Sequence, residues 1–113
     1  MKVVNVYEQY FSAELVFNGV ERRAAKVALI ATSEDGKIKY DAGVSFFPHR
    51  DEEDYAVSYD AWFERELFSA PGRRSRKREA KLMETFRAEI DALAEEAGGK
   101  VFWDEPLREA QMG

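Results

Sequence analysis

Two turn dipeptides, Asn18-Gly19 and Asp35-Gly36, divide the first half of the chain and limit how it can fold. Asn-Gly and Asp-Gly readily adopt the positive φ angles of a tight turn between two antiparallel strands. Before the first turn and after the second, apolar residues alternate with other residues, which is the period-two pattern of a strand with one buried face. The alternating apolar residues are Phe11, Ala13, Leu15 and Phe17, then Ile38, Tyr40, Ala42, Val44 and Phe46. The sequence therefore predicts an antiparallel meander.

Two further strands complete the predicted meander. Residues 3–10 form a strand before the first alternating segment, and residues 20–32 form a long one that is apolar on both faces near its end, as in a central strand. Pro48 ends the last strand of this half, because proline has no N–H to donate to a neighbouring strand. We expect one face of the sheet to be buried and the other to face water. The residues predicted to face water are Glu14, Lys37, Lys39, Asp41 and Ser45.

A long helix is predicted near the C-terminus, over about residues 75–97. Apolar residues recur there at spacings of three and four, which places them on one face of a helix. Ser75 is suited to the N-cap, and Gly98-Gly99 supplies a left-handed stop. The apolar face consists of Leu82, Met83, Phe86, Ile90, Leu93, Ala94 and Ala97. We expect a short strand over residues 100–103 to follow, and a flexible tail over residues 106–113.

The segment before this helix, residues 55–69, fits two patterns. Tyr55, Val57, Tyr59, Ala61 and Phe63 alternate as in a strand, whereas Tyr59, Trp62, Phe63 and Leu67 also fit a helical stripe. A serine at the N-cap, Ser58, and the Pro71-Gly72 stop favour the helix. We therefore predict a short helix from about Tyr59 to Ser69.

Strands precede helices along the chain, which predicts an α+β fold and not an alternating α/β fold. The expected architecture is an antiparallel sheet of about four to five strands, packed on one face by the long helix and the short one. The 113 residues are expected to form one domain over residues 1–105. With no cysteine, no signal peptide and no long apolar run, we expect a soluble, cytoplasmic protein without a membrane span.

A cluster of basic residues precedes and opens the long helix. The window 72–81 carries six basic residues and one acid, a net charge of +5, whereas the remaining residues carry 11 basic and 21 acidic side chains, a net charge of −10. Such segregation gives the protein one concentrated place to attract an anionic partner. The basic cluster comprises Arg73, Arg74, Arg76, Lys77, Arg78 and Lys81.

Three of these cations fall in the first helical turn, where the helix dipole disfavours positive charge by about 0.3–1 kcal/mol per residue. Cations at a helix N-terminus form a good site for a phosphate, a nucleic-acid backbone or an acidic peptide. The alternative is that the cluster is a solvated surface that pairs with acids of its own chain, for example those in residues 51–54. The sequence leaves both interpretations open.

Other residues give weaker signals. Tyr59 and Trp62 lie close to the cluster in sequence and are candidates for stacking on nucleic-acid bases, although aromatics at such spacing also form cores. The acidic run Asp51-Glu52-Glu53-Asp54 lacks the spacing of a calcium loop, and His49 has no neighbouring ligand or nucleophile. The chain contains no glycine-rich phosphate loop, no His-x-x-x-His and no Gly-x-Ser-x-Gly, so we expect no cofactor and no metal.

The leading hypothesis is a non-enzymatic binding module that contacts an acidic protein surface through the basic cluster. The first alternative is single-stranded nucleic-acid binding through the same cluster and exposed aromatics. The second is a small enzyme whose carboxylates come together only in the fold. A homodimer formed through an exposed sheet edge is a further expectation.

Overall fold

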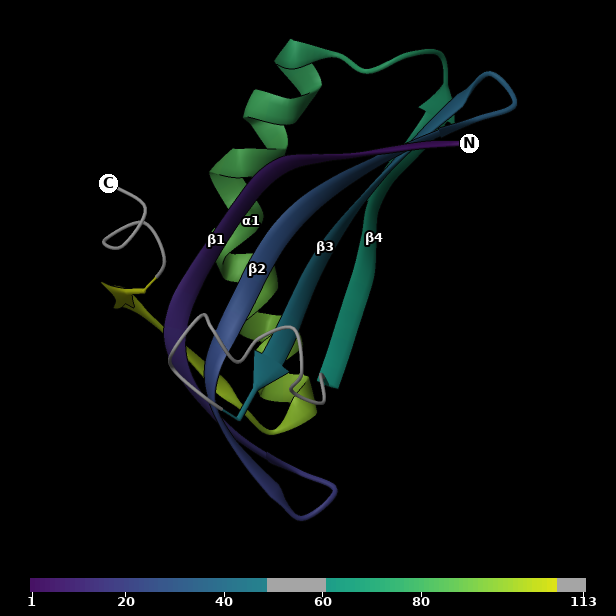
Figure 1. Cartoon of the computed structure of the whole chain (residues 1–113). Coiled ribbons are helices and arrows are strands. Elements are labelled where there is room, and N and C mark those ends of the chain that lie inside the picture. The colour runs from purple at the N-terminus through teal and green to yellow at the C-terminus, as the bar shows by residue number, and fades with distance from the viewer. Residues whose placement is uncertain (49–60, 108–113) are drawn as a thin grey trace.

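The computed structural model describes residues 1–48 and 61–107, and within these residues the chain forms a sheet and a helix. The sheet order is β4-β3-β2-β1-β5, and every neighbouring pair is antiparallel. The helix lies against one face of the sheet (Figure 1). The α+β fold is therefore confirmed. The elements are β1 (Lys2–Phe17), β2 (Val20–Glu34), β3 (Lys37–Phe47), β4 (Ala61–Pro71), α1 (Arg76–Ala97) and β5 (Lys100–Pro106).

The two predicted turns form the hairpins of the meander. Asn18 and Gly19 have φ angles of 52° and 75°, and Asp35 and Gly36 have φ angles of 52° and 74°. Positive values at both central residues define the tight turn whose twist matches that of the flanking strands. Residues 3–17, predicted as two consecutive strand segments, belong to the single strand β1. Its pairing with β2 shifts register at two places, as at a β-bulge.

The core lies between the sheet and α1. The apolar face of α1 buries Phe86, Ile90, Leu93 and Ala94, as predicted. The strands supply the facing layer, which consists of Phe11, Ala13, Leu15, Ala25, Val27, Leu29, Ala31, Ile38, Tyr40, Ala42, Val44, Phe46 and Ala61.

Both ends of α1 follow the predicted capping. Ser75 has extended φ and ψ angles of −136° and 121°, and its hydroxyl accepts a hydrogen bond from the Arg78 backbone N–H. Gly98 has a left-handed φ of 88°, and its N–H donates to the Glu95 carbonyl. The predicted helix is therefore confirmed. The predicted short strand is β5, which pairs with residues 11–14 of β1.

The predicted short helix from Tyr59 to Ser69 is wrong, because residues 61–71 form β4. Ala61 is buried, Trp62 exposed, Phe63 half-buried and Glu64 exposed, which is the alternation of a strand. Pairing with the free edge of β3 supplies the backbone hydrogen bonds of this segment, and such tertiary context overrides local helix signals. Tyr59 lies outside the described residues.

The prediction that Asp41 and Ser45 face water is also wrong, because their exposed fractions are 6% and 2%. They lie on the sheet face opposite α1, on either side of Gly43. The Trp62 indole lies so close over Gly43 that a Cβ atom there would be 2.2 Å from the Trp62 Cη2 atom. Trp62 therefore covers part of the sheet face that the alternating sequence pattern alone predicts to face water. Glu14, Lys37 and Lys39 are exposed, as predicted.

Candidate functional site: the basic start of α1

The basic cluster lies where the chain leaves the sheet and enters α1. The Gly72 N–H donates to the Gly36 carbonyl at 2.8 Å, which joins the end of β4 to the β2–β3 turn. Gly72 has a φ of 121°, a conformation that favours glycine. The chain then crosses from the end of the sheet to the first turn of α1 (Figure 1).

A buried carboxylate holds this crossing in place. Glu79 is 7% exposed, and its Oε2 accepts a hydrogen bond of 2.8 Å from the Tyr40 hydroxyl on β3. Arg74 donates from Nε to Glu79 Oε2 at 2.8 Å and from Nη2 to Oε1 at 3.0 Å, so the pair is bidentate. The Ser75 backbone N–H donates to the Tyr40 hydroxyl at 3.2 Å. Tyr40, Arg74 and Glu79 thus form one network, which we call the Glu79 network.

The Glu79 network shifts the acidity of its members. The Arg74 guanidinium, more than any other neighbour, lowers the pKa of Glu79 below its ordinary value, against the effect of burial. Burial raises the pKa of Tyr40, and the Glu79 carboxylate adds to that increase. The hydrogen bonds to Glu79 likewise raise the pKa of Arg74. At neutral pH, Glu79 is therefore ionised, Tyr40 keeps its proton and Arg74 is charged, and this combination allows all the hydrogen bonds of the network.

Arg78 is held differently. Its guanidinium carbon lies 4.1 Å from the centre of the Phe68 ring on β4, within the range of a cation–π contact. The contact restrains the side chain, and within the described residues the Arg78 guanidinium forms no ion pair with a carboxylate.

Four cations of the cluster are exposed and make no ion pair or ring contact within the described residues: Arg73, Arg76, Lys77 and Lys81. Their positive charge faces solvent at the start of α1. The interpretation that the cluster pairs with its own acids thus applies to Arg74. The suggested partners in residues 51–54 lie outside the described residues.

Sequence reasoning missed the role of Glu79. With Ser75 as the N-cap, Glu79 stands one residue beyond the position at which a capping box has its acid, so the local pattern gives it no capping role. The available signal was a single acid within a run of six cations. Its partner Tyr40 is 39 residues away in sequence, so only the fold brings the two together.

The structure does not bring Trp62 to the basic cluster. Trp62 is 42% exposed and lies at the beginning of β4, whereas the cluster follows the end of that strand. Gly72 lies ten positions after Trp62 along β4 and its end, or about 33 Å at 3.3 Å per residue. Trp62 donates from Nε1 to the Glu64 carboxylate at 3.2 Å. Tyr59, the other candidate for stacking, lies outside the described residues.

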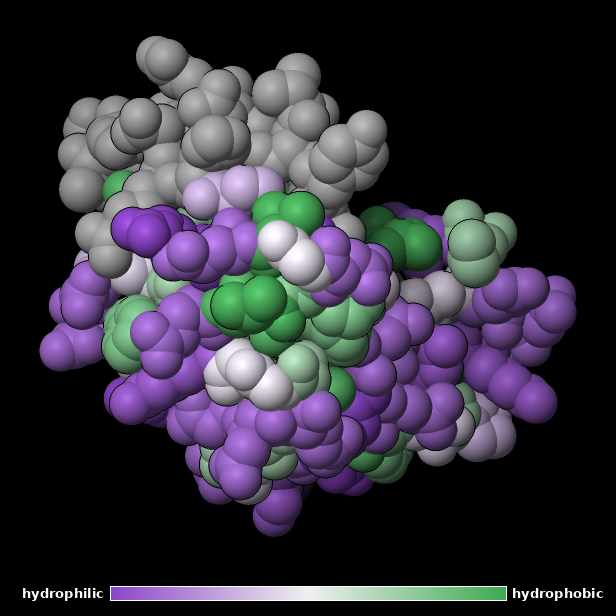
Figure 2. All heavy atoms as spheres, turned by 90° about the horizontal axis from the view of Figure 1, so that it is seen from below, coloured by the Kyte–Doolittle hydropathy of each residue, from purple (hydrophilic) through white to green (hydrophobic). Residues whose placement is uncertain are grey.

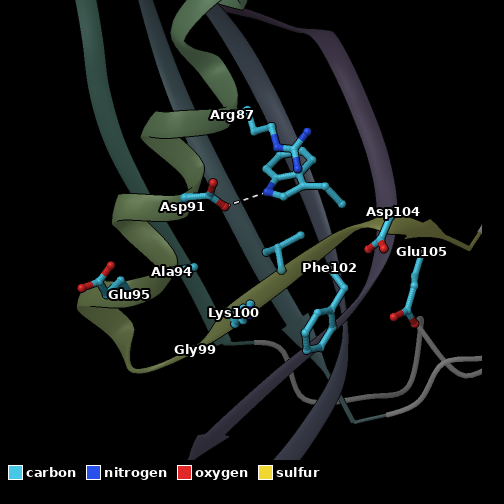
Figure 3. Close-up of a pocket in the computed structure, with 11 residues that line it drawn as sticks. Arg87, Asp91, Ala94, Glu95, Gly99, Lys100, Phe102, Asp104 and Glu105 are labelled. Carbon is cyan, nitrogen blue, oxygen red and sulfur yellow. Dashed lines mark hydrogen bonds between the residues drawn. The ribbon is translucent and has the colours of Figure 1, made fainter.

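A groove of about 670 Å³ runs between the second half of α1 and β5 (Figure 3). Trp103 forms part of its wall, donating from Nε1 to the Asp91 carboxylate at 2.6 Å. The Arg87 guanidinium lies 5.2 Å from the Trp103 ring centre. Four carboxylates and two cations line the groove, so both signs of charge are present: Asp91, Glu95, Asp104 and Glu105 with Arg87 and Lys100.

Asp41 is the buried carboxyl on the sheet face opposite α1. Burial raises its pKa, Glu64 and Glu66 add to the increase, and Lys39 opposes it from 3.7 Å. Asp41 does not line the groove beside β5. Within residues 1–48 and 61–107, no group of three potential ligands could hold a metal ion. His49 lies outside those residues.

The opposite end of the molecule, where α1 finishes, is mostly hydrophilic with a small hydrophobic area (Figure 2). Val16 and Val20 flank the β1–β2 turn and are 70% and 38% exposed. In the described part of the chain, no helix has the length and apolar character needed to cross a membrane.

No protein-family model, no curated protein and no solved structure matches this chain.

Proposed function

We propose that the protein is a binding module that contacts an anionic protein surface with the start of α1. The observation that carries this proposal is that the cations of the basic cluster are of two kinds, one bound within the fold and the others exposed. Arg74 is used to build the site, whereas Arg73, Arg76, Lys77 and Lys81 are exposed and without an ion-pair partner in the described residues.

The rigidity of the site supports the proposal. The Glu79 network joins the crossing to β3, and Ser75 caps the helix. Cations fixed on an ordered frame lose less freedom when they bind than cations on a flexible tail. The first turn of α1 adds backbone N–H groups that favour an anion.

An acidic protein surface suits the charge of the whole chain better than a nucleic acid does. The residues outside window 72–81 carry a net charge of −10, which repels a long polyanion that extends beyond the cluster. Nucleic-acid binding would also benefit from an aromatic beside the cations, and Trp62 lies about 33 Å along β4 at 3.3 Å per residue.

Titration of the purified protein with a fluorescent polyglutamate peptide short enough to stay within the basic cluster, followed by anisotropy at low salt, tests the proposal. Replacing Arg73 and Arg76 with glutamate should weaken binding about ten-fold or more, because two attractive charges become repulsive. The matched control is Arg23→Glu with Lys26→Glu, which makes the same change of net charge on β2 and should retain most of the binding.

Two results would contradict the proposal: no binding by the wild-type protein at low salt, or equal loss in the control and the cluster variant. A parallel titration with oligodeoxythymidine addresses the alternative. Binding of that probe that is tighter than binding of polyglutamate, and lost in the Arg73→Glu, Arg76→Glu variant, would favour nucleic acid as the partner.

A further inference from the structure

The outer face of α1, which points away from the sheet, is an exposed helical surface. Successive residues of an α-helix are about 100° apart, so residues at spacings of three, four and seven share a face. On this basis the outer face contains Lys77, Lys81, Glu84, Ala88 and Glu95, with Asp91 at its margin, and all are exposed. The core residues Phe86, Ile90 and Leu93 lie on the opposite side.

Charge is segregated along this part of the chain. Residues 73–86 carry six basic and two acidic side chains, a net charge of +4, and residues 87–105 carry two basic and six acidic side chains, a net charge of −4. The helix dipole favours acids at the start of a helix and bases at its end, so the net charge at each end of α1 has the unfavourable sign. The last turn contains no basic residue.

The outer face adds a second unfavourable arrangement. Lys77 and Lys81 are four residues apart, as are Asp91 and Glu95, so each end brings two like charges together on one face. Within the described residues, neither Lys77, Lys81 nor Glu95 forms an ion pair. Asp91 accepts a hydrogen bond from the neutral Trp103 indole. Within the described part of the isolated chain, both lysines and Glu95 therefore lack an ion-pair partner, and Glu84, three residues after Lys81, is the acid that shares the face with them.

We propose that the outer face of α1 binds the same face of a second copy of this chain, with the two helices antiparallel. Lys77 lies nine residues before Phe86 and Glu95 nine residues after it, while Lys81 lies five before and Asp91 five after. A two-fold axis at the level of Phe86 therefore places each lysine opposite an acid of the other copy. Each unfavourable cluster then meets a cluster of opposite sign.

The same axis suits the middle of the face. Glu84 and Ala88 lie two residues before and after Phe86, so the crossing point pairs a longer side chain with a small one. A small residue at the crossing lets two helices approach to the usual separation of about 8–10 Å. An antiparallel pair uses one surface on both copies and closes as a dimer, whereas head-to-tail contact would leave free ends.

The dimer proposed for α1 shares Lys77 and Lys81 with the proposed function but leaves Arg73 and Arg76 to an anionic partner. Arg76 is about 100° from Lys77 around the helix axis, and Arg73 precedes the helix, so both stay accessible in the dimer. The contact is built mainly from exposed ion pairs, which makes it weak and sensitive to salt.

Sedimentation velocity of the full chain tests the proposal, at concentrations up to the millimolar range in 20 mM and 500 mM NaCl. The wild-type protein should dimerise in the low-salt buffer, and the dimer fraction should fall several-fold at high salt because exposed charges are screened. Lys77→Glu with Lys81→Glu makes the face wholly acidic and should abolish the dimer. Asp91→Lys with Glu95→Lys makes it basic and should also be monomeric.

An equimolar mixture of the acidic and basic variants should restore a dimer, since their faces are complementary again. Because Asp91→Lys removes the hydrogen bond to Trp103, Glu95→Lys alone serves as a milder basic variant if the double variant melts early. The control Arg23→Glu with Lys26→Glu should dimerise like the wild type.

The proposal is overturned if the wild type remains monomeric in 20 mM NaCl, if the acidic variant still dimerises, or if mixing restores nothing. Failure of this proposal is distinguishable from failure of the proposed function. Arg73→Glu with Arg76→Glu should lose polyglutamate binding and keep the dimer, whereas Glu95→Lys should weaken the dimer and keep polyglutamate binding.

Discussion

The two ends of α1 carry charge of the sign that the helix dipole disfavours, yet they are built in different ways. At the start, the buried Glu79 carboxylate accepts hydrogen bonds from the Arg74 guanidinium and the Tyr40 hydroxyl, and so joins the helix to the sheet. At the finish, Asp91 holds the Trp103 indole in an exposed contact with the edge strand β5. One end is fixed by a buried network, and the other by surface contacts.

The difference separates charges that maintain the fold from charges that are open to a partner. A buried carboxylate must be paired, so Glu79 and Arg74 act as structural groups. The exposed cations beside them contribute little to stability and can be changed without damage to the fold. Variants at each end can test this separation.

Glu79→Ala is expected to have the largest effect. It removes the shared acceptor of Tyr40 and Arg74 and leaves both donors without it. Loss of a buried, charge-assisted partner costs several kcal/mol, and because Arg74 is partly exposed we expect about 2–3 kcal/mol. Urea denaturation checks the value, with Glu84→Ala, an exposed acid on the outer face, as the control. A loss below that of the control would show that the network does not anchor the helix.

The contribution of Glu79 should depend on pH. Because the pKa of Glu79 is lowered in the folded protein, its ionised form stabilises the fold above its unfolded pKa of about 4.3. That stabilisation is lost as the pH falls through the lower folded value. The difference in unfolding free energy between the wild type and Glu79→Gln should therefore be constant from pH 7 to about pH 5 and shrink in more acidic buffers. A difference that grows on acidification would contradict the assignment.

Tyr40→Phe is expected to have a smaller effect at the same end. The ring stays in the core, where its exposed fraction is 0%, while the hydroxyl that bonds Glu79 and the Ser75 N–H is removed. We expect a loss of about 1–2 kcal/mol, which corresponds to one or two hydrogen bonds. The double variant with Glu79→Ala should lose less than the sum of the two single variants, because both act on one network. Full additivity would show that Tyr40 and Glu79 act separately.

Local signals predicted much of this architecture. The turn pairs at residues 18–19 and 35–36 and the apolar stripe of α1 depend on neighbours in sequence, and each appears where expected. Residues 61–71 could not be assigned in this way, because pairing with β3 decides their conformation. On the sheet face opposite α1, the placement of Trp62 of β4 over Gly43 depends in the same way on pairing between strands.

The candidate site was predictable to the same extent. The run of cations is visible in the sequence, because charge density is a local property. Its division into structural and exposed members is not, since Arg74 binds a carboxylate, Glu79, that the fold also joins to Tyr40 of β3. The ring that holds Arg78, Phe68, likewise comes from another element, β4. The acids at the far end of α1 are visible in the sequence too, but only the helix places them on the same outer face as the lysines at its start.

At the other end of α1, Asp91→Ala should have a modest effect. It removes the 2.6 Å hydrogen bond from the Trp103 indole, which lies at the surface where water can replace the carboxylate. We expect a loss of about 0.5–1 kcal/mol, well below that of Glu79→Ala. Denaturation followed by tryptophan fluorescence checks it, with Glu95→Ala as the exposed control. A loss equal to that of Glu79→Ala would remove the contrast between the two ends.

The smallest expected effect has the opposite sign. Arg76→Ala removes an exposed cation from the first turn of α1, where the helix dipole disfavours it, and substitutes a better helix former. We therefore expect the protein to be unchanged or more stable by about 0.3–1 kcal/mol, measured by urea denaturation at low salt. Raising the salt concentration should shrink the gain, because the dipole effect is screened. A clear loss of stability would mean that Arg76 supports the fold as Arg74 does, and the basic cluster would then offer a partner one cation fewer.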